Sequence, residues 1–214
     1  MKHQCSLLVR AVGSKQSGAS LIMVMIILTI VSMLGIAAIQ ISVMGERSAR
    51  NDRDYQIAWQ SAEAGLLDAE TDISTATSSR SSVFSPTINT SAFVSGCGSS
   101  GNSQGLCTLV TPLTPVGSST KTAWLLADLA GTTSTITSAE YGQFTGRTFA
   151  TGSAGFQPSQ KPRYVIELVP DNGGRDSVGR DLTNPEPQFV YRITSMGFGP
   201  RADIQAVIQA VYRN

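Results

Sequence analysis

Few side chains in this sequence of 214 residues can carry out chemistry. The only histidine is His3, and the three cysteines are Cys5, Cys97 and Cys107. Ser-His-Asp and Cys-His catalysis both need a histidine base beside the nucleophile. The chain also has no G-x-S-x-G, P-loop or H-E-x-x-H motif. We therefore predict that the protein is not an enzyme and uses no cofactor.

Acidic side chains at two places are candidates for metal binding or acid–base chemistry. Residues 171–181 form a Gly-rich stretch with three aspartates, whose oxygens suit Ca²⁺, but their spacing is not that of an EF-hand. A solvated hairpin loop is the preferred interpretation, with calcium binding as the alternative. We expect Glu63 and Asp68 to form a solvated helix face or subunit contacts rather than an acid–base pair. Cys97 and Cys107 lack the further ligands that a metal needs, so no metal site is predicted.

A long uncharged run near the amino terminus predicts the first structural element of the chain. Residues 19–45, 27 in number, include no charged side chain. At about 1.5 Å per residue, a helix of that length reaches roughly 40 Å and crosses a bilayer core of about 30 Å. Lys2, Arg10 and Lys15 precede the run, and acids and bases balance after it. The positive-inside rule then places the amino terminus in the cytoplasm.

Three interpretations of this run are open. A cleaved secretory signal has an apolar core of about 7–15 residues and a small-residue cleavage site, which fits poorly here. An unprocessed membrane anchor and a segment processed by another peptidase both remain.

The formal net charge of +1 gives no electrostatic indication of nucleic-acid binding, so nucleic acid is excluded as a partner.

The helical pattern continues beyond the apolar run. Apolar side chains recur at spacings of three and four, which is typical of one helical face. They are Tyr55, Trp59, Ala62, Leu66, Ala69 and Ile73. We therefore predict one helix over residues 19–73, apolar all round in its first half and packed on a head domain through this stripe in its second.

The rest of the chain predicts mostly irregular and β structure. In residues 74–95, 12 of 22 side chains are Ser or Thr and Pro86 breaks any helix, so irregular structure is expected. Residues 124–129 predict a short helix ending at Gly131. Strands are expected at 163–169, 189–195 and 202–212, the last with the period-two pattern of a strand. An antiparallel meander packed on the helix gives an α+β domain.

Several segments together resemble a known family. Lys15-Gln16-Ser17-Gly18 before Ala19 resembles a type IV prepilin cleavage site. The motif Ala62-Glu63-Ala64, followed by Asp68-Ala69-Glu70, is similar to the amino-terminal region of PilX-type minor pilins, low-abundance subunits of type IV pili. Residues 141–146, Tyr-Gly-Gln-Phe-Thr-Gly, are similar to that family as well. The resemblance implies a type IV pilin-like fold.

The resemblance also implies processing. A prepilin peptidase would cut between Gly18 and Ala19, and Ala19 would be N-methylated. The expected parts are a basic leader (1–18), a long helix (19–73) and a periplasmic or extracellular head (74–214). Loss of the leader removes Cys5 and leaves an even pair of cysteines in an oxidising compartment, so we predict a Cys97–Cys107 disulfide.

The implied function is that of a minor pilin in pilus assembly, priming or near the tip, supporting adhesion and twitching. Implied partners are the prepilin peptidase, other minor pilins, the major pilin and a PilY-type tip adhesin. The inner membrane holds the chain before assembly, and the pilus or cell surface afterwards. Met23 and Gln40 depart from the Glu and Pro of major pilins at the fifth and twenty-second mature positions. A type II secretion pseudopilin and a non-polymerising membrane-anchored binding module are the alternatives.

Overall fold

Helix α1 (Ala19–Ser74) is a single α-helix of 56 residues, the long amino-terminal helix that the sequence predicts. The structure is a computed structural model that describes residues 19–108, 123–152, 156–170 and 189–213. The chain divides into two compact units, residues 1–49 and 50–214, and α1 contributes to both. We call the first half of the helix, residues 20–45, the apolar half, and the unit of residues 50–214 the head.

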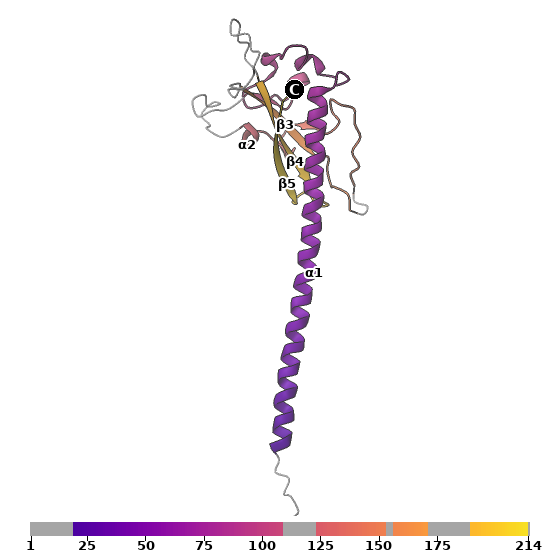
Figure 1. Cartoon of the computed structure of the whole chain (residues 1–214), viewed down its shortest axis with the longest axis vertical. Coiled ribbons are helices and arrows are strands. Elements are labelled where there is room, and N and C mark those ends of the chain that lie inside the picture. The colour runs from indigo at the N-terminus through magenta and orange to yellow at the C-terminus, as the bar shows by residue number, and fades with distance from the viewer. Residues whose placement is uncertain (1–18, 109–122, 153–155, 171–188, 214) are drawn as a thin grey trace, which may run out of the picture. The chain divides into compact units, whose positions relative to one another are not determined.

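The head combines the second half of α1 with short helices and a sheet (Figure 1). Three 3-10 turns are η1 (Ser81–Val83), η2 (Thr90–Ala92) and η3 (Gly101–Ser103), and α2 spans Ala123–Leu126. The strands are β1 (Leu106–Thr108), β2 (Ala139–Glu140), β3 (Arg163–Pro170), β4 (Phe189–Phe198) and β5 (Gln205–Tyr212).

The sheet has the order β1-β3-β4-β5, with β2 paired beside β1 on the same strand, β3. Strands β3, β4 and β5 form the predicted antiparallel meander, in which Ile166 is opposite Ile193 and Ile193 opposite Ala210. Strand β1 pairs parallel to β3, with Leu106 opposite Ile166. The sheet is therefore mixed rather than purely antiparallel. The sequence did not predict β1, because a strand of three residues is too short to show an alternating pattern.

Small residues let α1 approach the sheet closely. Ala58, Ala62 and Ala69 are buried on the helix. At Gly197 on β4, a Cβ atom would overlap the Ala62 nitrogen and the Ala58 carbonyl oxygen. Gly65 likewise has no room for a side chain beside the Ser195 hydroxyl. The backbone of α1 therefore packs directly on β4 at this contact.

The predicted apolar stripe on α1 is right at one end and wrong at the other. Ala62, Ala69 and Ile73 are buried, but Tyr55 and Trp59 are 48% and 42% exposed. The face against the sheet is centred on small residues, and the two aromatic rings lie beside it. The size of the side chains determines which face of α1 packs on the sheet, whereas the stripe was predicted from hydrophobicity alone.

The Ser/Thr-rich segment is irregular, as expected, but it supplies part of the core. Val83, Phe84 and Phe93 are buried in the cluster that includes Ile73, and the rings of Phe84 and Tyr191 are 5.6 Å apart. The sheet's other face carries a smaller cluster of Cys97, Cys107, Leu129 and Val165, with Trp124 of α2 against it.

Helix α2 is shorter than predicted. It ends at Leu126, since the Asp128 amide donates to the Thr137 hydroxyl at 2.8 Å instead of continuing the helix. Gly131, expected as the helix cap, has φ +66° and lies against the Arg163 side chain.

Candidate functional site

The apolar half of α1 presents every one of its side chains away from the chain. Two of its hydroxyl groups bond to the helix itself, since Thr29 donates to the Ile26 carbonyl at 2.8 Å and Ser32 to the Leu28 carbonyl at 2.7 Å. Such satisfied hydroxyls are compatible with a hydrocarbon environment. By length and composition alone, α1 can cross a membrane. Ala19 is its first residue, and Gly18 lies outside the described residues.

The second half of α1 differs from the apolar half because it buries a carboxylate. Asp72 is fully buried and forms an ion pair with Arg80, which is also fully buried. The Asp72 carboxylate accepts hydrogen bonds from the Arg80 Nε atom at 2.8 Å, from the Ser78 hydroxyl at 2.6 Å and from the Tyr164 hydroxyl at 3.1 Å. Burial first, and then the charge of Asp72, raise the pKa of Tyr164, which therefore remains a hydrogen-bond donor. Each buried charge is paired and hydrogen-bonded, the condition under which buried ions are tolerated.

The loop between the two cysteines supplies a further hydrogen-bond acceptor for Arg80. Its NH1 group donates to the carbonyl of Gln104 at 2.6 Å, and its guanidinium lies 3.7 Å from the centroid of the Phe144 ring. The sequence analysis missed this residue. One signal was available: Arg80 is the only charged residue in the Ser/Thr-rich segment 74–95.

Asp68, one turn earlier on α1, is buried as well. It accepts from the Gly142 amide at 2.8 Å and from the Thr145 hydroxyl at 2.6 Å, while Arg147 is 3.9 Å away. Burial raises the pKa of Asp68. The expectation that Asp68 belongs to a solvated face or a subunit contact is therefore wrong, whereas its companion Glu63 is exposed and accepts from the Trp59 ring nitrogen at 2.8 Å.

These contacts join two segments that the sequence analysis singled out separately. The turn 141–146 reaches α1 at Asp68, and Gly142 has φ +77° with the Arg147 carbonyl where a Cβ would lie. Only glycine fits this position without strain. The motif around Asp68 and the motif around Gly142 thus act as one structural unit.

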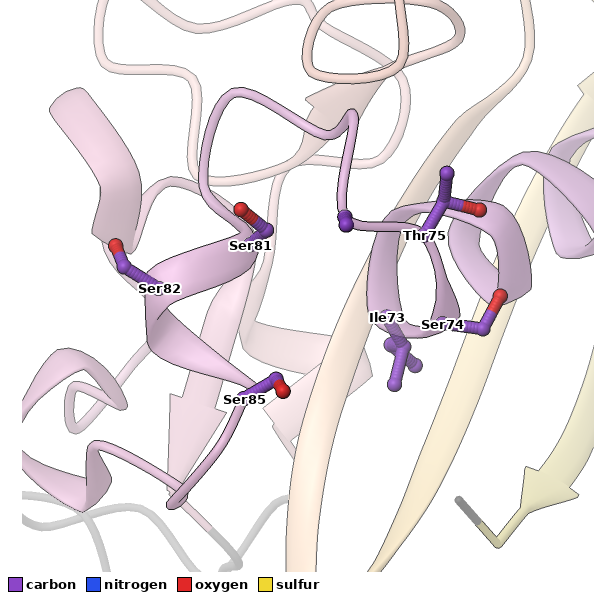
Figure 2. Close-up of a pocket in the computed structure, with 7 residues that line it drawn as sticks. Ile73, Ser74, Thr75, Ser81, Ser82 and Ser85 are labelled. Carbon is purple, nitrogen blue, oxygen red and sulfur yellow. The ribbon is translucent and has the colours of Figure 1, made fainter.

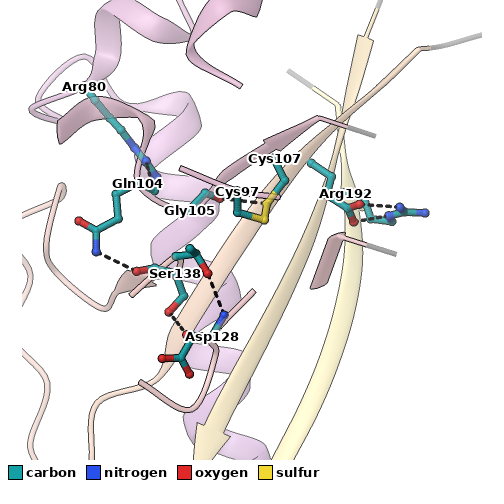
Figure 3. The surroundings of a disulfide bond; sticks show 10 residues. Arg80, Cys97, Gln104, Gly105, Cys107, Asp128, Ser138 and Arg192 are labelled. Carbon is teal, nitrogen blue, oxygen red and sulfur yellow. Dashed lines mark hydrogen bonds and ion pairs between the residues drawn. A yellow bond between two sulfur atoms is a disulfide. The ribbon is translucent and has the colours of Figure 1, made fainter. Parts of the chain in front are cut away.

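The disulfide between Cys97 and Cys107 is present, and both residues are buried (Figure 3). Its loop is anchored on the head through Gln104, whose side-chain amide donates to the Ser138 carbonyl at 3.1 Å. The disulfide thereby helps to hold Gln104, whose carbonyl accepts a hydrogen bond from Arg80, in place. On the same face of the sheet, Glu167 is fully buried and accepts from Arg192 at 2.7 and 2.8 Å.

A pocket of about 470 Å³ lies at the carboxyl end of α1. Figure 2 shows it surrounded by hydroxyl side chains from the last turn of α1 and from the segment around η1, and none of its lining residues is charged. Ser74 already bonds to the Glu70 carbonyl at 2.8 Å. The described lining of the pocket is therefore neutral.

No group of three or more metal-binding side chains occurs in the described part of the chain. The calcium alternative at residues 171–181 falls outside the described residues. The described polar groups therefore form pairs and networks that hold the head together.

A long amino-terminal helix, apolar in its first half and packed on a mostly antiparallel sheet in its second, defines a pilin-like α+β protein. Comparison with family models agrees: the PilX N-terminal model matches residues 17–67, and the type IV pilus assembly protein PilX C-terminal model matches residues 45–214.

Since the second match covers well over half of the chain, the protein belongs to the PilX family of type IV pilus assembly proteins, a structural rather than enzymatic family. The family implies partners within the pilus machinery, and the apolar helix is consistent with a membrane or pilus location. Neither the curated proteins nor the solved structures gave a significant match.

Proposed function

We propose that the protein is a minor pilin that primes or caps type IV pili and supports adhesion and twitching. The observation that carries this proposal is the exposed apolar half of α1 in a chain whose head belongs to the PilX family. Apolar surface of that length needs either lipid or apolar partners. A minor pilin has lipid before assembly and neighbouring subunits after it.

In this proposal the chain is inserted with its amino terminus in the cytoplasm, as the leader charges favour. The prepilin peptidase removes residues 1–18 and Ala19 is N-methylated. Other minor pilins and the major pilin then contact the apolar half, and a PilY-type adhesin joins the complex. The match to pilus assembly proteins favours this role over that of a type II secretion pseudopilin or a non-polymerising binding module.

Met23 supports a place near the tip. By resemblance, the fifth-position Glu of major pilins neutralises the amine of a neighbouring subunit, and an uncompensated buried ion costs several kcal/mol. Met23 offers no such charge, which matters least for a subunit added early. A low copy number follows.

Sequencing the amino terminus by mass spectrometry tests the processing step. The mature chain should begin at N-methylated Ala19, and Gly18→Arg should leave the leader attached, while Ser17→Ala should be cut normally. Intact Met1 on protein recovered from pili would contradict the proposal.

Quantitative proteomics of sheared pili tests the place in the fibre. Wild-type protein should be scarce relative to the major pilin and gold-labelled at fibre ends. Met23→Glu should increase incorporation along the fibre, and Met25→Glu, with the same charge two positions on, should not. Even labelling of wild-type fibres would rule out the tip position but not pilin processing.

A further inference from the structure

We propose that the head carries an oxyanion-binding pocket that takes a carboxylate or phosphate group. The pocket, about 360 Å³ in volume, is lined by three cations, Arg147, Lys161 and Arg163. Glu140 is the one carboxylate among the described residues that line it, and Gln104 and Gln143 contribute side-chain amides. This inference rests on the head alone and does not depend on the proposed position in the pilus.

The pocket walls come from separate parts of the head and are bonded to one another. Gln143, in the turn after β2, donates to Gln104 of the disulfide loop at 2.7 Å. Arg163, the first residue of β3, donates to Glu140 of β2 at 2.9 Å. The pocket is therefore built before any ligand arrives, which reduces the entropy lost on binding.

The charges in the pocket do not cancel. Both oxygens of Glu140 are engaged, one by Lys161 and one by Arg163, each at 2.9 Å. Three cations against one carboxylate leave two positive charges around the pocket. Arg147 also pairs with Asp68, 3.9 Å away, a carboxylate that accepts hydrogen bonds from Gly142 and Thr145; with this pair counted, one positive charge is still left over.

The cations that line the pocket still have N–H groups with which to donate hydrogen bonds to a ligand. The Lys161 ammonium has three N–H groups and one carboxylate partner, and the Arg147 guanidinium offers a planar fork suited to two oxygens of one anion. Both side chains are 43% exposed, so they can reach a ligand. Oxyanions match this set of donors, and the volume admits a group larger than the bare ion.

Calorimetric titration of the full chain in non-ionic detergent tests the proposal, with inorganic phosphate and succinate as separate probes. We expect saturable binding of at least one probe at low salt, weakening as NaCl is added. Arg147→Gln with Lys161→Gln should weaken it at least tenfold, and Glu140→Gln should strengthen it severalfold. Binding of phosphate alone or of succinate alone would support the pocket and identify the group it takes.

The matched control is Arg201→Gln, because Arg201 is 71% exposed, pairs with Asp203 and lies outside the pocket. It should leave binding unchanged. The proposal is overturned if neither probe binds saturably, or if Arg201→Gln weakens binding as much as the double variant does. Melting curves without ligand verify that each variant is folded, and Lys161→Gln alone serves if the double variant is not.

Discussion

The two halves of α1 distribute polarity in opposite ways. In the apolar half, large side chains such as Leu28 and Met33 are 66% and 74% exposed. In the half that belongs to the head, Asp68 and Asp72 are fully buried. One continuous helix thus exposes what is usually inside and buries what is usually outside.

The difference lies in where each half finds its partners. The head half is packed against its own chain, which supplies Arg80, Thr145 and the Gly142 amide to the buried carboxylates. The apolar half makes its side-chain hydrogen bonds only to its own helix among the bonds described, and its apolar surface requires an environment from outside the chain. Substitutions in the two halves should therefore fail in different assays.

Breaking the Asp72–Arg80 pair should have the largest effect. Asp72→Asn leaves Arg80 buried without its counter-charge, which should lower the free energy of unfolding by about 3–5 kcal/mol. Chemical denaturation of the oxidised protein measures this. Glu63→Gln is the matched control on the exposed face and should change stability by less than about 0.5 kcal/mol. Similar losses for both variants would mean that burial does not distinguish the two acids.

A charge in the apolar half should disturb membrane insertion and leave the head intact. Leu28→Arg should cost about 2.5–3.5 kcal/mol of insertion free energy. Membrane fractionation should show less of the variant in the membrane, with Leu28→Ile behaving as wild type. The melting temperature of the head should not change, because distant sites are additive. A lower melting temperature would show that the two halves are coupled.

Removing the disulfide should have a moderate effect within the head. Replacing Cys97 and Cys107 by serine should lower stability by about 2–3 kcal/mol, as expected for a short closed loop. Thermal unfolding with and without reductant measures the same difference in the wild-type protein. A reductant effect in the serine variant would point to a cause other than this disulfide.

Asp68→Asn should have the smallest effect and the clearest pH dependence. Because burial raises the pKa of Asp68, its contribution to stability is greatest below the ordinary Asp range and is lost as pH rises through the folded-state pKa. The one carbonyl oxygen of asparagine can accept from the Gly142 amide, and its NH2 group can donate to the Thr145 hydroxyl oxygen, so the change at low pH should stay within about 1 kcal/mol. With rising pH the variant should gain on wild type. Parallel pH profiles for the two proteins would contradict the assignment.

Periodicity was enough to predict the frame of the fold. The alternation through Ala206, Ile208 and Ala210 and the length of the uncharged run predict β5 and α1 without any tertiary information. Strands β1 and β2 could not be found this way, because strands of three and two residues contain no period.

The polar core was beyond sequence reasoning for a different reason. A hydrophobic pattern assigns Asp68 and Asp72 to the surface, and only tertiary contacts reveal their donors. Two of those donors lie far along the chain, in the turn at Gly142 and on β3 at Tyr164. The cleavage site between Gly18 and Ala19 stays a prediction.

Strand β5 has a consequence for handling the protein outside its native assembly. It lies at the end of the described strand order, and its eight residues, Gln205–Tyr212, contain no charge, proline or glycine. An uncharged edge of that composition is a template for aggregation, because its free amides and carbonyls can pair with another strand. Val211, 68% exposed, is the position where a lysine would protect purified protein at little cost to the core.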